Sequence, residues 1–309
     1  MPDFPGRAFL LAFLVSLLVT TAAVSQTGLG DPILLSGSER MEFNRPESWA
    51  MKYFTSVSMM SGIGTTETTR PGSIHLSFEG GFVPSLGEEK RRVGFIGSKV
   101  EDLNRTNVFA RLRGAVGLPR RYVLEVGVTP PVEVDGVTPE LFNLALARPL
   151  VESSSWRVGL RLHGQVGTIA GDLTCPAELA GVADSRLNPD ECLVPSNDEV
   201  TQNYVGLEMS VARRLESTRW SPHVAASINY LDLEFQVDAR YSAFLDRVRL
   251  LTAGYTYYVA TGVSYRMNDK LTLGGEVFYS PLSVVRSAQV GSTNDELLTA
   301  RFLARYRLH

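Results

Sequence analysis

The residues in this sequence that are best suited to chemistry are arginines and glutamates that recur at alternate positions of otherwise apolar segments. In residues 156–167, Arg157 and Arg161 alternate with Val158, Leu160 and Leu162. The full candidate set is Glu79, Arg111, Arg113, Glu125, Arg157, Arg161, Glu208, Arg266, Glu276, Arg301 and Arg305. A ring of arginines in a channel favours anions, whereas facing arginines and glutamates form ion pairs. We therefore expect mainly a network of ion pairs, with a narrow path for small anionic solutes as the alternative.

Other reactive residue types occur singly or in incomplete sets. His75 and Ser77 lie two positions apart on one face of a segment, where a histidine can activate a serine hydroxyl. His163 and His223 each stand alone on similar faces. The sequence has no glycine-rich phosphate loop and no zinc or calcium motif. We therefore expect no catalytic residue, no metal and no cofactor. A lipid-modifying hydrolase that uses His75 and Ser77 is a lesser alternative.

The two cysteines, Cys175 and Cys192, lie in a stretch rich in proline, asparagine and aspartate that is typical of a loop. In an exported protein, the oxidising compartment favours a disulfide between them. Closing a loop of this size stabilises a fold by about 3 kcal/mol. Two thiols without a nearby histidine make a poor metal site, so the sequence predicts a disulfide.

Residues 1–25 have the layout of a secretory signal peptide. An apolar run over residues 8–19 follows a basic residue, and the small residues Ala23 and Ser25 precede Gln26. The run is shorter than the ~20 residues that a spanning helix needs. We expect cleavage near Gln26 and no later transmembrane helix. The formal net charge of −3 gives no sign of nucleic-acid binding.

The charged positions belong to ten segments in which polar and apolar residues alternate, as they do in β-strands. The segments are 74–82, 107–118, 122–129, 142–147, 156–167, 204–211, 223–230, 255–266, 271–280 and 298–308. The connections alternate between short and long; the long ones are 84–105, 130–140, 169–201, roughly 234–250, and 281–296. Short periplasmic turns and long extracellular loops are typical of outer-membrane barrels. This alternation predicts that both termini of the mature chain lie on the periplasmic side.

The apolar faces of these segments carry no charged residue, and a charge in mid-membrane costs ~2–4 kcal/mol. Aromatic residues gather toward the segment ends on those faces, as in the girdles of membrane barrels; they are Phe82, Tyr122, Trp156, Tyr230, Tyr255, Tyr265, Tyr279 and Tyr306. Both features favour lipid contact over the core of a secreted β-sandwich. The sequence thus predicts an all-β, antiparallel up-and-down transmembrane β-barrel of ten strands. Twelve strands are the alternative, if residues 51–60 form one of two further strands.

The chain resembles the small bacterial outer-membrane β-barrel superfamily, the porin-like and OmpA-like barrels, over roughly residues 73–309. The resemblance rests on the signal peptide, the alternating strands and the final segment TARFLARYRLH. In that segment Phe302, Tyr306 and Leu308 fit the alternation that the barrel-insertion machinery reads, and the extra His309 departs from it. The resemblance implies an origin in a Gram-negative bacterium and a place in the outer membrane, in contact with its lipids.

These observations divide the chain into a signal peptide (1–25), a periplasmic or lumen-associated segment (26–72) and the barrel (73–309). We expect a non-enzymatic, monomeric barrel with a structural or surface role, or one that passes small solutes through a narrow arginine-rich lumen. A surface-binding protein of the adhesin type is the alternative. In that case the cysteine-containing loop over residues 169–201 would carry recognition, because loops on rigid scaffolds commonly do.

Overall fold

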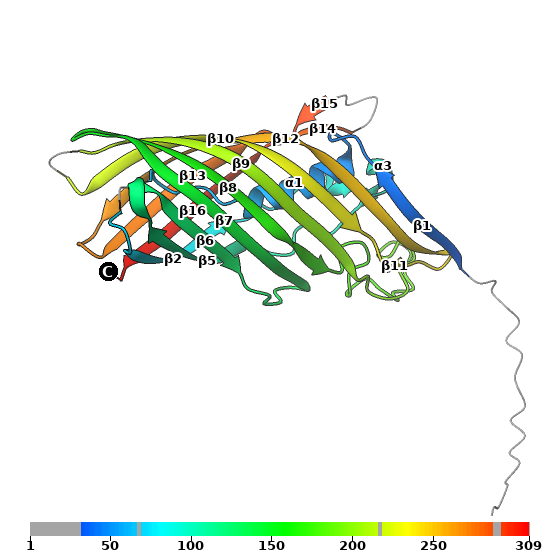
Figure 1. The fold of residues 1–309 in the computed structure, drawn as a ribbon. Coiled ribbons are helices and arrows are strands. Elements are labelled where there is room, and N and C mark those ends of the chain that lie inside the picture. Colours follow the sequence, from blue (N-terminus) through cyan, green and yellow to red (C-terminus); the bar gives the residue numbers. More distant parts are fainter. Residues whose placement is uncertain (1–31, 67–68, 216–217, 287–291, 309) are drawn as a thin grey trace, which may run out of the picture. The chain divides into compact units, whose positions relative to one another are not determined.

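Ten antiparallel strands form a closed barrel in the computed structural model, which describes residues 32–66, 69–215, 218–286 and 292–308 (Figure 1). The strands are β2 (Ile74–Phe82), β5 (Val108–Gly117), β6 (Val123–Thr129), β7 (Val137–Glu152), β8 (Trp156–Gly171), β9 (Asp198–Arg213), β10 (Trp220–Gln236), β12 (Phe244–Arg266), β13 (Leu271–Ser280) and β16 (Leu297–Arg307). Each pairs with its neighbour in the chain, and the ladder between β16 and β2 completes the circle. The predicted fold class and strand number are confirmed. The signal peptide and His309 lie outside the described residues.

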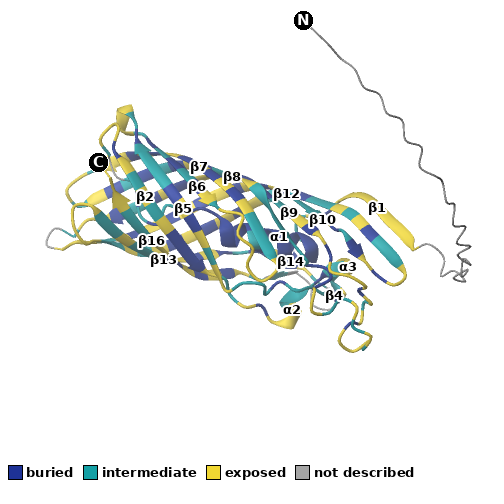
Figure 2. Ribbon diagram, turned by 90° about the horizontal axis from the view of Figure 1, so that it is seen from below, coloured by how far each residue is buried: buried dark blue, intermediate teal, exposed yellow. Residues whose placement is uncertain are grey.

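The alternation of the sequence gives the barrel its two faces. On β8, Leu162 is 52% exposed on the outer surface, whereas the preceding Arg161 is 1% exposed and points inward. Exposed and buried positions alternate along most of β7, which Figure 2 colours by burial. Aromatic pairs lie on the outer face, with ring centroids 4.5 Å apart for Trp220 and Tyr265. An apolar exterior of this kind is the surface that a membrane barrel turns to lipid.

One wall of the barrel is much taller than the other. Strands β7, β8, β9, β10 and β12 have 16 to 23 residues, whereas β6 has 7 and β13 has 10. The prediction of a long loop over roughly residues 234–250 is wrong: β10 reaches Gln236, β12 begins at Phe244, and the short strand β11 (Ala239–Arg240) pairs with β12. At this height the outward positions are polar, as in the 2.6 Å ion pair between Arg249 and Glu234. The outward side chains therefore meet water and not lipid, while Leu231 and Leu233 on the inner face belong to the buried core, so the pattern of an apolar outer face disappears.

The chain before the barrel runs along its wall and then through its lumen. Strand β1 (Ile33–Arg40) pairs in parallel with the upper part of β12, from Ile33 beside Phe244 to Arg40 beside Leu251. Helix α1 (Pro46–Ser58) follows inside the barrel, and β2 begins at the opposite end (Figure 1). Ile33, the first residue of β1, thus lies at the long-loop end. The parity of the strands predicted that the mature chain starts at the short-turn end; its expected start near Gln26 lies outside the described residues.

The remaining elements belong to the connections. The loop before β5 contains α2 (Glu88–Arg91), β3 (Arg92–Val93), α3 (Gly94–Gly97) and β4 (Lys99–Val100), and the loop before β16 contains β14 (Ser283–Val285) and β15 (Ser292–Asn294). A 3-10 turn, η1 (Pro119–Arg121), joins β5 to β6. The predicted disulfide between Cys175 and Cys192 is present, packed against Val237 and Tyr241. Among the described residues, no helix combines the length and the apolar character needed to cross a bilayer.

Candidate functional site

The end of helix α1 is held in mid-lumen by arginines of the barrel wall. The last carbonyls of a helix have no partner within it and need donors from elsewhere. Arg301 of β16 donates from Nη1 to the carbonyl of Met59 at 2.6 Å and from Nη2 to that of Ser56 at 2.7 Å. Arg111 of β5 donates to the carbonyl of Ser58. Two of the predicted lumen charges therefore bind backbone, and that backbone belongs to the inserted segment.

Two further arginines continue this contact below the helix. Arg113 donates to the carbonyl of Ser61 at 3.0 Å, and Arg161 donates to the carbonyl of Met60 at 3.1 Å. The segment after the helix also donates to the wall, since the amide of Gly62 reaches Glu208 at 3.0 Å. Met60 and Ser61 are fully buried. At this height the chain itself fills the lumen.

The same arginines pair with the predicted glutamates. Arg113 lies 3.0 Å from Glu79 and 2.6 Å from Glu125, and Arg161 lies 3.3 Å from Glu125 and 3.6 Å from Glu208. The strand register explains why Arg161 and Glu208 lie close together, because it places them directly opposite each other on β8 and β9. Charges buried in this way are tolerated only when they are paired and hydrogen-bonded. We call these five residues, with Arg111 and Arg301, the lumen clamp.

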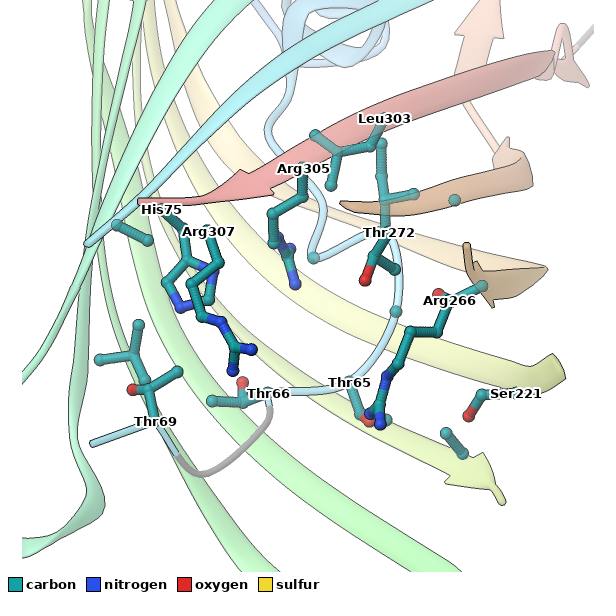
Figure 3. Close-up of a pocket in the computed structure, with 18 of the residues that line it drawn as sticks. Thr65, Thr66, Thr69, His75, Ser221, Arg266, Thr272, Leu303, Arg305 and Arg307 are labelled. Carbon is teal, nitrogen blue, oxygen red and sulfur yellow. The ribbon is translucent and has the colours of Figure 1, made fainter. Parts of the chain in front are cut away.

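The other predicted charges lie outside the lumen clamp or at its margin. Glu276 accepts a hydrogen bond from Ser61 Oγ and lies 3.7 Å from His223. Arg157, Arg266 and Arg305 line a separate cavity of about 350 Å³ at the short-turn end. Figure 3 shows Arg266 and Arg305 reaching into it, together with Arg307. We call it the lower cavity.

The histidines that raised the question of catalysis are dispersed in the structure. His75 lines the lower cavity, whereas His163 lies 3.2 Å from Ser227 Oγ and stacks edge-on against Tyr204. Within the described ranges, no cluster of three histidine, cysteine, aspartate or glutamate side chains has an arrangement that could hold a metal ion. The charged residues of the lumen clamp thus bind backbone and one another.

A second cavity, of about 490 Å³, lies in the barrel wall between β5 and β7 and is lined mostly by apolar side chains. Leu112, which is 60% exposed, contributes from the outer face of the wall. Leu141, which is 2% exposed, contributes from the inner face. A cavity that touches both faces must pass through the wall. We call it the wall cavity.

The wall is open there because β6 is short. Its pairing with β5 begins at Leu112, opposite Val128, and its pairing with β7 begins at Leu141, opposite Thr129. In the described sheet, residues 108–111 of β5 and 137–140 of β7 therefore have no strand between them. Pro130 and Pro131 follow β6 directly and lack the N–H groups that would extend the ladder.

A third cavity, of about 330 Å³, lies at the long-loop end between α1, the β3–β4 region and the tall part of β10 and β12. It shares four lining residues with the wall cavity: Phe54, Leu103, Leu173 and Val200. We call it the upper cavity. The two apolar spaces are therefore neighbours, and the side chains between them come from α1, two loops and β9.

The sequence did not predict the wall cavity, nor that the arginines of the lumen clamp bind backbone carbonyls of residues 56–61. The inward direction of the arginines followed from their period, but the carbonyls that they bind have no side-chain signature. The proline pair after β6 was visible in the sequence and marked the end of a strand. Its consequence, a gap in the wall, depends on the lengths of both neighbouring strands.

Comparisons with known proteins give a loose structural likeness only. No family model matches the sequence, and no curated protein matches it. The outer membrane protease OmpT from Escherichia coli superimposes with a TM-score of 0.36 and 10% identity, over 77% of this chain and 94% of that one. Ail of Yersinia pestis gives 0.30 and 11%, over 77% and 100%, and the Pseudomonas putida toluene transporter TodX gives 0.33 and 11%, over 90% and 78%. Similarity at this level assigns neither a family nor a function.

The class of protein follows from the chain's own geometry. A closed barrel of ten antiparallel strands, with an apolar outer face, charged lumen and long loops at one end, is an integral outer-membrane β-barrel of the bacterial type. It contains one described disulfide, in the loop between β8 and β9.

Proposed function

We propose that this barrel binds small apolar molecules in the wall cavity and passes them between the long-loop end and the surrounding bilayer. The observation that supports the proposal is the wall cavity itself, which reaches from lumen-facing Leu141 to lipid-facing Leu112 where the sheet is unpaired. At about 490 Å³ it falls within the usual size range of small-molecule sites, which is roughly 300–1,000 Å³.

The lining of the cavity favours an apolar occupant. Helix α1 contributes Phe54 and Val57, and β5 contributes Phe109 and Leu112. Burying apolar surface in such a space stabilises a ligand by roughly 25 cal/mol per Å² removed from water. A charged solute would lose its hydration without gaining enough partners in return.

The upper cavity supports a direction for the passage. It lies at the long-loop end, which faces the cell exterior in barrels of this class, and it adjoins the wall cavity at Phe54 and Leu103. A molecule that enters from outside would therefore pass alongside α1 and leave through the wall. This route does not cross the lumen clamp.

Passage of small anions along the barrel axis, the alternative raised by the arginine-rich lumen, is less well supported. Arg111, Arg113, Arg161 and Arg301 are engaged with the inserted segment and the glutamates of the lumen clamp.

We keep the proposal that the barrel is non-enzymatic and monomeric. A role in surface recognition would rest on the disulfide-linked loop between β8 and β9.

The test uses naphthalene as the apolar probe and equilibrium dialysis against the full barrel in detergent micelles, with empty micelles as the blank. We expect saturable binding to the wild type. Ala110→Trp places an indole in the wall cavity and should weaken binding about tenfold, because overpacking costs roughly 1–3 kcal/mol. Ala300→Trp is the matched control, since Ala300 is also exposed on the outer face and lies outside that lining.

Two results would contradict the proposal. One is a wild-type barrel that takes up no more naphthalene than empty micelles. The other is equal binding by wild type and Ala110→Trp, which would move the probe to another place on the barrel. Heat-modifiable migration on gels checks that both variants are folded.

A further inference from the structure

The wall cavity is apolar toward the bilayer, but its inner side carries polar groups of the lumen. Ser58 at the end of α1, Arg111 of β5 and Gln202 of β9 belong to its lining. All three are buried, whereas Leu112 of the same lining is exposed on the outer face. The cavity therefore has an apolar end and an end with hydrogen-bonding groups.

Gln202 has a hydrogen-bond donor that lacks an acceptor. Its Oε1 accepts from Ser58 Oγ at 2.9 Å, and its backbone carbonyl accepts from Gln165 Nε2 at 3.2 Å. Its Nε2 is buried and has no hydrogen-bond partner among the described residues. Buried polar groups nearly always have a partner, because an unpaired donor away from water is unfavourable. The amide nitrogen of Gln202 is therefore available to an acceptor in the wall cavity.

Arg111 adds further donors beside the same residue of α1. Its Nη2 donates to the carbonyl of Ser58, whereas its Nε and Nη1 have no hydrogen-bond partner in the part of the chain that the structure describes. Nη1 lies 3.7 Å from Glu79 Oε2, which is an ion pair but too long for a hydrogen bond. Because Arg111 and Gln202 both contact Ser58, they bring their unpaired N–H groups to one end of the cavity.

Two other polar residues of the lining are already engaged elsewhere. Arg105 pairs with Asp102 at 3.0 Å and with Asp172 at 2.9 Å. Thr106 Oγ1 donates to the carbonyl of Val108 at 2.8 Å. Neither residue therefore competes with Arg111 and Gln202 for the polar group of an occupant.

We propose that the wall cavity takes an apolar molecule with an uncharged oxygen at one end, a hydroxyl or a carbonyl group, which accepts hydrogen bonds from Gln202 Nε2 and Arg111. This inference rests on the proposed function and names the class of ligand. The apolar part lies toward Leu112 and the bilayer, and the oxygen lies beside Ser58. A few well-placed polar groups in a mostly apolar pocket commonly fix the orientation of a small ligand.

An uncharged oxygen fits the surroundings of Arg111 better than a carboxylate does. Glu79 is fully buried and lies 3.7 Å from Arg111 and 3.0 Å from Arg113. A carboxylate beside Arg111 brings a second negative charge close to Glu79, and like charges repel strongly in a buried region. A hydroxyl or carbonyl oxygen accepts from the same N–H groups without that repulsion.

The experiment compares naphthalene, 2-naphthol and 2-naphthoate by equilibrium dialysis against the full barrel in detergent micelles at about pH 7. At this pH a phenolic hydroxyl keeps its proton and a carboxylate is ionised. Gln202→Met removes the donor at nearly constant side-chain length. We expect affinity for 2-naphthol to fall about tenfold, because one hydrogen bond to a buried group is lost, and affinity for naphthalene to stay unchanged. Comparing each variant with the wild type for the same probe cancels uptake by the micelles.

Asn229→Leu is the matched control. Asn229 is a buried amide on the inner face of β10, its Nδ2 also lacks a partner among the described residues, and it lies outside the lining of the wall cavity. It should bind all three probes as the wild type does. Gln202→Glu keeps the size of the side chain, replaces the donor by an acceptor and should repeat the loss seen in Gln202→Met. Heat-modifiable migration on gels checks that the variants are folded.

The outcomes separate this inference from the proposed function. Saturable binding of 2-naphthol that exceeds that of 2-naphthoate and weakens only in the Gln202 variants supports the inference. Unchanged 2-naphthol binding in those variants, an equal loss in Asn229→Leu, or tighter binding of 2-naphthoate overturns it, while saturable binding of naphthalene still supports the proposed function. Failure of all three probes to bind the wild type overturns both.

Discussion

Replacing Arg301 should release the segment that fills the lumen. Its guanidinium donates to three carbonyls at the end of α1, those of Ser56, Val57 and Met59, and lies 3.5 Å from the ring centre of Phe278. Hydrogen bonds from a charged donor contribute roughly 1.5–3 kcal/mol each. Because they share one side chain they are not additive, and we expect Arg301→Met to cost about 3–5 kcal/mol, the usual cost of removing one member of a buried charged set.

Hydrogen exchange of backbone amides measures this cost where it arises. Local opening follows the free energy of the region that opens, so a loss of 3 kcal/mol accelerates exchange over residues 56–61 by about a hundredfold. Arg301→Lys retains the charge without the planar fork of donors and should give an intermediate rate. Arg247→Met, at the exposed rim, should leave these amides unchanged.

A second readout separates release of the segment from general destabilisation. If the segment leaves the lumen, Arg301→Met should conduct ions in planar bilayers where the wild type does not. The reasoning would be refuted if exchange over residues 56–61 stayed at the wild-type rate. It would also be refuted if all ten strands lost protection to the same degree, because Arg301 would then support the barrel and not the inserted segment.

The loops at the long-loop end give two further predictions. Replacing Cys175 and Cys192 by serine should make residues 172–197 sensitive to protease, with a loss of about 3 kcal/mol in the loop, while the barrel remains heat-modifiable on gels; cleavage within the strands would contradict this. Burial raises the pKa of Glu101 from its ordinary 4.5 to about 7, although Lys99 at 2.8 Å opposes the shift. A raised carboxyl pKa favours the folded loop below about pH 4.5 and withdraws that stability as pH rises through 7. The loop over residues 83–107 should therefore resist protease better at pH 5 than at pH 8, and Glu101→Gln should remove the difference.

The strands of the membrane-spanning band could be predicted from the sequence because the information is local. Every residue of β13 faces either lipid or lumen, so the period of two over residues 271–280 is complete, and the predicted bounds match the strand. Above the membrane-spanning band, the difference between apolar outward and polar inward positions is lost. Leu245 and Arg247 belong to the same strand as Tyr257, yet no apolar alternation marks them, because their side of the sheet faces water where the lower part of the strand faces lipid.

The inserted segment could not be predicted in the same way. Helix α1 is buried on nearly all sides, so its sequence lacks the polar face that reveals an amphipathic helix. Its contacts are also distant: Trp49 donates to the carbonyl of Asp295 at 3.0 Å, and Lys52 donates to that of Ser283 at 2.7 Å. A pattern in residues 46–58 alone carries no trace of those partners.

The lumen clamp and the wall cavity are connected through Arg111 and the end of α1. In the proposed function, an opening in the wall would let an apolar molecule leave without passing the middle of the lumen, so that the axis could remain closed by charge. Arg111 connects the two features, since it binds the carbonyl of Ser58 on one side and lines the wall cavity on the other. Val57 and Ser58 line the same cavity. The helix end that closes the axis is therefore also one wall of the apolar site, and releasing it would open the barrel to ions and dismantle the site together.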